Sequence, residues 1–213
     1  MTPPGSRPDR ATALAQYRRR AGIYDLELLL FEPIRRRAIE RLELRPGGVV
    51  LDVGCGTGLS FVGLRERIGA AGRIVGIEQS PEMIAKARHR VEQHGWDNVT
   101  LVNAPVAQAA IRGKADAALF HFTHDILREP RALANVVRHL KPGARVAACG
   151  LKWSRPWAVG VNLAVLAAAR HSVTTLDGLR EPWNHLARLV DDLRIESALA
   201  GGVFVATGVV RRR

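Results

Sequence analysis

The sequence is poor in cysteine, aromatic residues and lysine. Only Cys55 and Cys149 are cysteines, and neither lies in a C-x-x-C or His/Cys ligand spacing. This scarcity argues against a disulfide framework and a zinc site, so we predict no metal and a reducing, cytoplasmic location. Only 4 of the 32 basic residues are lysine, and the formal net charge is +12. That balance permits anionic partners such as acidic metabolites, a lipid surface or nucleic acid, without selecting one.

Long apolar runs are also missing. The most apolar late stretch, 157–169, is too short to span a bilayer and contains Asn162. Residues 1–9 are rich in Pro, Gly and Arg and have no apolar core, which argues against a signal peptide. A chain of 213 residues is long enough for one domain with a sizeable core and too short for two ordinary ones. We therefore predict a single soluble domain.

The chain does contain a strand–turn–helix signal at residues 49–60, VVLDVGCGTGLS. Its first residues predict a buried parallel strand, and the spacing after Leu59 predicts a helix. Gly54, Gly56 and Gly58 allow close backbone approach to a ligand, and the free N–H groups of a helix start favour a polar or anionic one. The spacing is not the G-x-G-x-x-G of dinucleotide folds, and Asp52 would repel a pyrophosphate but suits an ammonium group.

This stretch resembles motif I of the class I S-adenosylmethionine (SAM) dependent methyltransferases nearly letter for letter. The alternative is a glycine turn in another α/β protein. The resemblance implies SAM as cofactor and S-adenosylhomocysteine as product. It implies a Rossmann-like α/β fold: a seven-stranded, mostly parallel sheet with an antiparallel C-terminal hairpin strand and an N-terminal helical lid. The residues of this stretch that it assigns to the cofactor are Asp52, Gly54, Cys55, Gly56, Thr57, Gly58 and Ser60.

A second strand is predicted at 72–77, and Glu78 follows it 20 residues after Gly58. A carboxylate at that place can accept both ribose hydroxyls of a nucleoside, and the alternative is a solvated strand-end carboxylate. Ser80 as N-cap and Pro81 at the first helical position predict a helix over 81–93. Gln79 and Met83 belong to the second motif of the family, in which the methionine packs on the adenine.

A third strand is predicted at 99–102, followed by Asn103 and Ala104. The family commonly has Asp-Ala here, with the carboxylate accepting a hydrogen bond from the adenine amino group. The side-chain oxygen of Asn103 can accept the same bond without charge. This departure weakens the assignment without removing it.

Ahead of the first strand, residues 11–44 have a helical pattern with a kink predicted at Pro33. We divide the chain into an N-terminal helical lid, 1–44, and a Rossmann-like domain, 45–213. Tyr17 and Tyr24 resemble the start of the phosphatidylethanolamine and ubiquinone/menaquinone methyltransferase group, where a tyrosine approaches the methionine carboxylate of SAM. The alternative is simple packing of both rings. The arginine triplets 18–20 and 35–37 are typical of solvated faces and could also meet an anionic membrane surface.

A fourth strand is predicted at 115–120, followed by the sequence HFTHD at 121–125. Ligands of open α/β sheets lie at the carboxyl ends of the strands, so this loop should face the transferable methyl. His121 and His124 are the candidate general bases, because imidazole titrates near neutral pH, and Asp125 could orient one of them. The alternative is that His121 and Phe122 only shape the cofactor pocket while His124 and Asp125 cap the next helix.

The rest of the chain predicts a helix at 131–140, a strand at 145–149 and helices at 157–170 and 183–193. Two β-like runs, 194–200 and 203–207, flank Gly201-Gly202 and predict an antiparallel hairpin. Trp153, Trp157 and Trp183 could form an aromatic wall for an acceptor, or they could be core residues.

Three functions follow. The first is methyl transfer from SAM to a nitrogen or oxygen atom of a small metabolite or lipid headgroup. The second is RNA or DNA methylation, which the basic charge suggests. Two observations argue against it. The length leaves no room for an appended RNA-binding module, and no Asn-Pro-Pro-Tyr-like tetrapeptide follows the fourth strand. The third is SAM binding without methyl transfer. The acceptor and the oligomeric state are not predicted.

Overall fold

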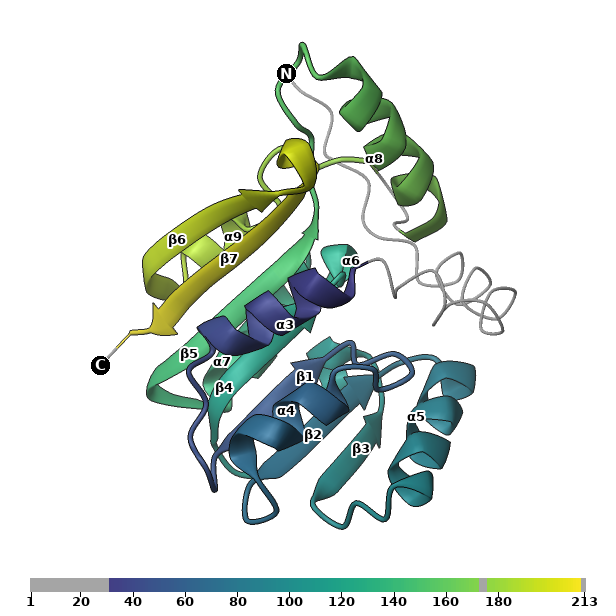
Figure 1. Ribbon diagram of the computed structural model, residues 1–213. Helices are drawn as coiled ribbons and strands as arrows, with labels where there is room; N and C mark the ends of the chain where they lie inside the picture. Colours follow the sequence, from purple (N-terminus) through teal and green to yellow (C-terminus); the bar gives the residue numbers. More distant parts are fainter. Residues whose placement is uncertain (1–30, 173–175, 212–213) are drawn as a thin grey trace.

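A seven-stranded sheet forms the centre of the computed structural model, which describes residues 31–172 and 176–211 (Figure 1). The strand order is β3-β2-β1-β4-β5-β7-β6. Neighbouring strands among β1 to β5 pair in parallel, and β7 pairs antiparallel with both β5 and β6. The predicted Rossmann-like sheet with its antiparallel C-terminal hairpin is therefore confirmed, whereas residues 1–30 of the predicted lid lie outside the described residues. The strands are β1 (Val49–Val53), β2 (Arg73–Glu78), β3 (Val99–Asn103), β4 (Ala115–His121), β5 (Leu140–Leu151), β6 (Val190–Ala198) and β7 (Val203–Val210).

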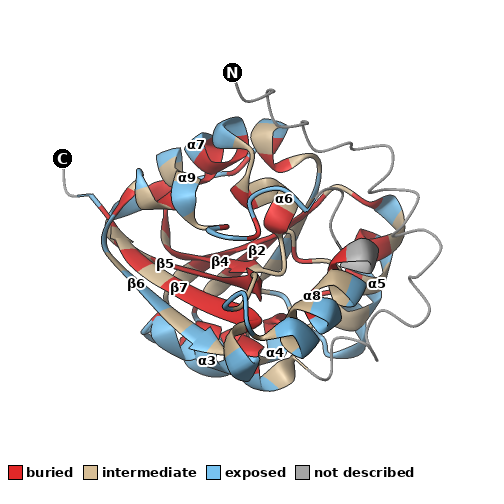
Figure 2. Ribbon diagram, turned by 90° about the horizontal axis from the view of Figure 1, so that it is seen from above, coloured by how far each residue is buried: buried red, intermediate tan, exposed pale blue. Residues whose placement is uncertain are grey.

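Helices cover both faces of this sheet. Figure 2 shows α3 and α4 on one face and α7 and α9 on the opposite one. The strands between them are buried on both faces, which is why β1 and β4 read as continuous apolar runs. The helices are α3 (Glu32–Arg41), α4 (Phe61–Ile68), α5 (Pro81–Gln93), α6 (His124–Leu127), α7 (Pro130–Arg138), α8 (Val159–Ser172) and α9 (Asn184–Ala187), with 3₁₀ turns η1 (Val106–Gln108) and η2 (Leu199–Gly201).

The start of α5 follows from its sequence. The side chain of Ser80 accepts a hydrogen bond from the backbone N–H of Met83 at 3.2 Å, and Pro81 occupies the first helical position, where no N–H is needed. Gly95 has a φ of 60° just after the helix end, as a C′ glycine does. This cap fixes where the chain turns after β2, and so it fixes the place of Glu78.

Three local predictions differ from the structure. Pro33 lies in the first turn of α3, after a non-helical Phe31, so it begins a helix there instead of kinking one. The helix predicted at 183–193 is only α9, because Val190 already pairs with Val210 in the sheet. Sheet pairing outweighs helix propensity there. The hairpin connection is also longer than Gly201-Gly202, since β6 ends at Ala198 and η2 follows.

Helix α8 lies beyond the end of the sheet next to the β6–β7 hairpin (Figure 1). Its outer surface exposes Val159 and Leu163, both at 61 %, and Trp157 just before it is 74 % exposed. Trp183 instead packs edge-on against Phe204, with ring centroids 5.1 Å apart. The three tryptophans therefore do not form a common wall. In the described part of the chain, no helix has both the length and the apolar character to cross a membrane.

Candidate functional site

The glycine loop turns tightly at the carboxyl end of β1. Gly54, Gly56 and Gly58 have φ values of 72°, 56° and 79°, a region that favours glycine. The N–H groups of Gly54 and Cys55 both donate to the carbonyl of Ile77 in β2, at 2.8 and 3.0 Å. The loop is thereby tied to the strand that carries Glu78. It lies at the carboxyl edge of the sheet, where parallel α/β sheets bind ligands.

Asp52 is a buried carboxylate beside this loop. Its side chain is 1 % exposed, and Oδ2 has no hydrogen-bond partner. Burial raises its pKa to about 7, and the nearby guanidinium of Arg35 opposes that rise. Buried polar atoms normally have partners, so an unpartnered carboxylate oxygen indicates a place for a cationic or hydrogen-bond-donating ligand. An ammonium group satisfies that requirement.

Glu78 closes the other side of the loop. Its Oε2 accepts a hydrogen bond from the N–H of Gly56 at 3.1 Å, and Oε1 accepts one from the N–H of Ser80 at 2.8 Å. Burial raises the pKa of this carboxyl, and the backbone N–H donors oppose that effect. An ionised carboxylate has about four acceptor positions. The N–H of Gln79 also acts on this carboxylate, so no more than two positions remain for hydroxyl groups of a ligand.

Asn103 lies next to Glu78 in the sheet register, at the end of β3. Its Nδ2 donates to the carbonyl oxygen of Glu78 at 2.9 Å. Because a carbonyl can only accept, this bond assigns the amide orientation and leaves Oδ1 available as an acceptor. Ala104 donates its N–H to the same carbonyl at 3.1 Å, while the side chain of Met83 is buried. The end of β3 thus offers a hydrogen-bond acceptor close to Glu78.

The other residues predicted for the cradle are partly or fully buried. Burial raises the pKa of the Cys55 thiol well above its usual range, which leaves it unreactive. The carbonyl of Thr57 accepts a hydrogen bond from Nε of Arg90 at 3.0 Å. Ser60 is the N-cap of α4 but makes no side-chain capping bond there. Gln79 is half-buried between Glu78 and the start of α5. In the described residues, no group of three His, Cys, Asp or Glu could hold a metal ion.

The loop after β4 contacts the glycine loop directly. A Cβ atom on Gly54 would lie 2.5 Å from Cγ2 of Thr123 and 2.8 Å from Cδ1 of Ile126. Phe122 has a positive φ of 55°, and its N–H donates to the carbonyl of Cys149 at 2.8 Å. Strained backbone of this kind persists only where its surroundings hold it. The structure therefore brings residues 121–125 beside the glycine loop.

His121 and His124 lie in different surroundings. His121 pairs with Cys149 in the sheet register, and its Nε2 is buried without a hydrogen-bond partner. Burial lowers its pKa well below the usual value, and the charge of Arg35 lowers it further. Asp125 is half-buried, and its charge raises the pKa of His124. The three predicted catalytic residues are thus separated: His121 lies near Arg35, whereas His124 and Asp125 lie in α6.

His124 is held from outside its own loop. Its Nε2 lies 3.1 Å from the carbonyl oxygen of Asp177, so Nε2 must carry the proton and Nδ1 the lone pair. Desolvation lowers the pKa of His124, opposed by the Asp177 carbonyl and by Asp125, while Arg128 lowers it further. The imidazole is therefore neutral near pH 7.

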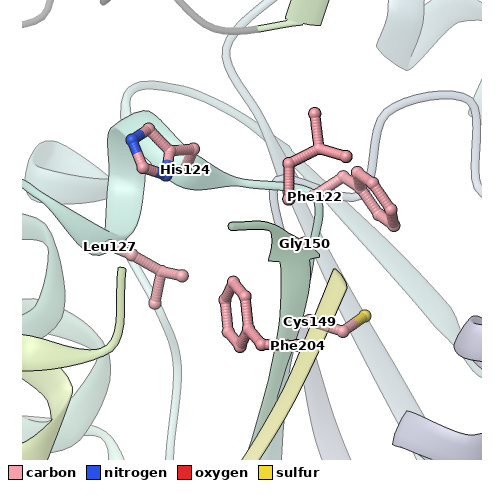
Figure 3. A pocket seen from close by; sticks show the side chains of 7 residues that line it. Phe122, His124, Leu127, Cys149, Gly150 and Phe204 are labelled. Carbon is pink, nitrogen blue, oxygen red and sulfur yellow. The ribbon is translucent and has the colours of Figure 1, made fainter. Parts of the chain in front are cut away.

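A hollow of about 260 Å³, part of it open to solvent, lies beside His124 (Figure 3). His124 stands at its rim, with Leu127 and Phe204 across from it and Phe122 at the far side. Cys149, Gly150 and Leu151, at the end of β5, complete the lining. The hollow is thus apolar apart from one imidazole and one thiol. It suits the reacting end of a small apolar molecule.

Two residues of the site were not predicted as such. Arg35 was expected on a solvated face, but it is 2 % exposed, pairs with Glu32 and has Nε and Nη2 unpartnered. The helical spacing of buried Ile34, Ala38 and Ile39 could have indicated that it faces the sheet. The role of the Asp177 carbonyl has no sequence signal, since any residue could supply it. The predicted Tyr17 and Tyr24 lie outside the described residues.

Residues 50–143 match the model of a family described as a methyltransferase domain. Over 148 residues the chain is 30 % identical to nocamycin O-methyltransferase of Saccharothrix syringae, which covers 67 % of this chain and 53 % of that protein. It is also 30 % identical to 2-phytyl-1,4-naphtoquinone methyltransferase of Thermosynechococcus vestitus, over 62 % of this chain and 61 % of that one. The chain thus spans little more than half the length of these relatives.

The structure is similar to that of a SAM-dependent methyltransferase from Aquifex aeolicus. The TM-score is 0.60 at 21 % identity, over 89 % of this chain and 97 % of that chain. At 21 % identity, this similarity shows that the two proteins share a fold and shows nothing further.

Proposed function

We propose that this chain is a class I SAM-dependent methyltransferase domain and that it methylates a nitrogen or oxygen atom of a small molecule; its strand order and its match to a methyltransferase family model support this. The observation that carries the proposal is the unpartnered, buried Oδ2 of Asp52 beside the glycine loop. That oxygen, the spare acceptors of Glu78 and the free Oδ1 of Asn103 match an ammonium, a ribose and an adenine amino group. Bound SAM would supply a sulfonium-bound methyl group there.

Each of these residues has a separate binding role. Asp52 would pair with the ammonium of the methionine part, and Glu78 would accept from both ribose hydroxyls. The unpartnered N–H groups of Arg35, whose charge already acts on Asp52, would donate to the methionine carboxylate. Gly56 must stay a glycine because its φ is positive where the backbone approaches the ligand. Tyr17 and Tyr24 remain proposed contacts of the same carboxylate.

The chemical step asks mainly for positioning. Methyl transfer from a sulfonium needs the nucleophile at about 3 Å from the methyl carbon and in line with the breaking bond. An acceptor that carries a proton also needs a base. His124 faces the hollow and has a free Nδ1 lone pair, so it is the proposed base. His121 and Phe122 shape the wall toward Arg35, and Asp125 supports the imidazolium as it forms.

The test has two stages. Titration calorimetry with SAM should give a saturable heat that Asp52→Asn removes, since an amide cannot pair with an ammonium as a carboxylate does. Incubation with methyl-labelled SAM and a metabolite extract, followed by mass spectrometry, should then reveal a labelled small-molecule product. Absence of SAM binding by the folded protein would refute the proposal.

The finer assignments are proposals as well. One relative is named for a phytylated naphthoquinone and another for nocamycin, so a quinone-type or nocamycin-like acceptor is in range. Nucleic acid methylation would require turnover on RNA or DNA together with steeply salt-dependent binding. SAM binding without transfer is the other alternative, and a labelled product would exclude it.

A further inference from the structure

Among the residues that the structure describes, none that lines the hollow beside His124 could hold a charged acceptor. Phe122, Leu127, Leu151 and Phe204 provide most of its lining, and neither a carboxylate nor a lysine or arginine is among the lining residues. An ammonium or a phosphate placed there would lose its hydration without gaining a counter-charge, which is costly. A neutral, apolar molecule has little hydration free energy to lose there, and it gains contact with two aromatic rings.

The imidazole of His124, which lines the hollow, can act as a proton acceptor. The carbonyl of Asp177 fixes the proton of His124 on Nε2, so the second ring nitrogen, Nδ1, has its lone pair free. Such a nitrogen can accept a hydrogen bond from a hydroxyl but cannot donate one. It therefore binds and orients a protic acceptor, and it offers nothing to an acceptor that needs a donor.

We infer that the acceptor is a neutral, flat, apolar molecule whose nucleophile is an aromatic or enolic hydroxyl, seated in this hollow with its O–H directed at His124. This rests on the proposed function and selects oxygen over nitrogen within it. In the reaction the acceptor O–H bond breaks and the proton passes to Nδ1 of His124. The acceptor oxygen forms the new bond to the methyl carbon as the carbon–sulfur bond breaks, and that electron pair stays on sulfur. The imidazolium then returns its proton to water.

The size of the hollow limits the part of the acceptor that enters it. Its 260 Å³ includes space that is open to solvent, so the enclosed part is much smaller than a pocket that surrounds a whole ligand. Only the reacting edge of an acceptor would enter it, and the rest of the molecule would extend into solvent. Gly150 forms part of the floor, and a Cβ atom there would be 3.4 Å from Cε1 of Phe204, an ordinary contact. A methyl group is therefore tolerated at this position, whereas a longer side chain would fill the space.

Matched probes test the inference. We would incubate the protein and methyl-labelled SAM with 4-fluorophenol, 4-fluoroaniline, 4-fluorobenzylamine or phosphoethanolamine. Binding of the three fluorinated probes to the SAM-loaded protein would be followed by ¹⁹F NMR. We expect labelled methyl ether from the phenol at a rate at least tenfold above any amine product. Preferred methylation of an amine, or no phenol binding by the SAM-loaded protein, would overturn the inference and leave the methyltransferase proposal standing. Failure to bind SAM would instead refute the methyltransferase proposal.

A variant pair places the acceptor in this hollow. Gly150→Leu should raise the KM for 4-fluorophenol at least tenfold and remove its ¹⁹F line broadening, with SAM affinity unchanged. Gly160→Leu is the matched control, because Gly160 lies on α8 outside this lining with nothing within 4 Å of an added Cβ, and it should leave both close to the parent. Thermal unfolding and SAM calorimetry establish that both variants are folded. Unaltered phenol binding by folded Gly150→Leu would mean that the acceptor binds elsewhere.

Discussion

Gly54 and Thr123 are in such close contact that a Cβ atom on the glycine would lie 2.5 Å from Cγ2 of the threonine. One residue belongs to the proposed cofactor loop and the other to the loop that carries both candidate bases. Packed interiors transmit a change of this size because they have few voids to absorb it. The cofactor cradle and the proposed acceptor site are therefore mechanically one unit.

The first prediction follows from that contact. Gly54→Ala should lower the free energy of unfolding by about 1–3 kcal/mol, through the clash and the positive φ, and should weaken SAM binding at least tenfold. Thermal unfolding and calorimetry measure the two effects. Gly160→Ala is the control, because its Cβ would meet nothing within 4 Å on α8. That substitution should leave SAM affinity unchanged, and a parental affinity in Gly54→Ala would contradict the predicted coupling.

Most of the fold could be predicted from the sequence because its signals are local. The apolar runs of β1 and β4, the glycine turn and the Ser80 cap each depend on neighbours in the chain. The error at 183–193 has the opposite origin. Val190 enters a strand because it pairs with Val210, a contact between distant residues that no local pattern encodes.

The candidate site also has features that local sequence patterns predict and features that depend on contacts between distant residues. Asp52 lies near the end of β1 and Glu78 ends β2, and the structure places both beside the glycine loop. The separation of His121 from His124 depends on which faces of β4 and α6 they occupy, and the tautomer of His124 depends on a carbonyl 53 residues away. Arginine is usually solvated, so the burial of Arg35 could be inferred only from its apolar neighbours on α3.

The second prediction concerns the hydrogen bonds that the carboxylate of Glu78 accepts. The carboxylate already accepts from the N–H groups of Gly56 and Ser80, so Glu78→Ala would leave two N–H groups and two ribose hydroxyls without this partner. We expect SAM binding to weaken by about 1–3 kcal/mol. Glu78→Gln keeps one side-chain oxygen and should fall between parent and alanine. Equal SAM affinity in all three proteins, measured by calorimetry, would show that the ribose lies elsewhere.

The third prediction is a pH dependence of cofactor binding. The pKa of Asp52 is raised to about 7 by burial, and pairing with an ammonium requires the ionised form. SAM affinity should therefore fall below pH 7, approaching tenfold per pH unit, and it should fall again above pH 8 as the ammonium group of SAM loses its proton. Arg35→Met removes the charge that lowers this pKa, so the midpoint should move to higher pH. Calorimetry from pH 5.5 to 9 measures both curves, and a flat parental curve would exclude Asp52 as the ammonium partner.

The fourth prediction concerns stability without ligand. Asp52 binds its proton more tightly in the folded protein, at a pKa of about 7, than in the unfolded chain, where the value is 3.8. Between pH 4 and 7 the folded state keeps a proton that the unfolded state has lost, so Asp52 makes stability fall with rising pH in this window. The full effect is on the order of 4 kcal/mol. Asp52→Asn should unfold at higher temperature than the parent at pH 8, and a lower unfolding temperature would contradict this account.

The last prediction separates the two histidines. His124 lines the hollow with its Nδ1 lone pair free, whereas His121 is buried beside Arg35 with a pKa well below the usual value. General base catalysis contributes about 10²–10⁴-fold, so His124→Ala should lower kcat about a hundredfold with nearly unchanged SAM affinity. His121→Ala should act mainly on SAM affinity, because its neighbours are the proposed carboxylate-binding arginine and the cradle.

The pH profile decides whether His124 is a base or only a wall of the pocket. A base becomes dispensable as the acceptor ionises by itself, so the kcat defect of His124→Ala should shrink as pH rises toward the pKa of the acceptor hydroxyl, about 10 for a phenol. A packing defect would persist at every pH. His124→Gln keeps a polar side chain without a titratable nitrogen, and it should show the same pH-dependent defect as alanine. If both variants lose a constant fraction of kcat across pH, the acceptor is activated by proximity alone and His124 only positions it.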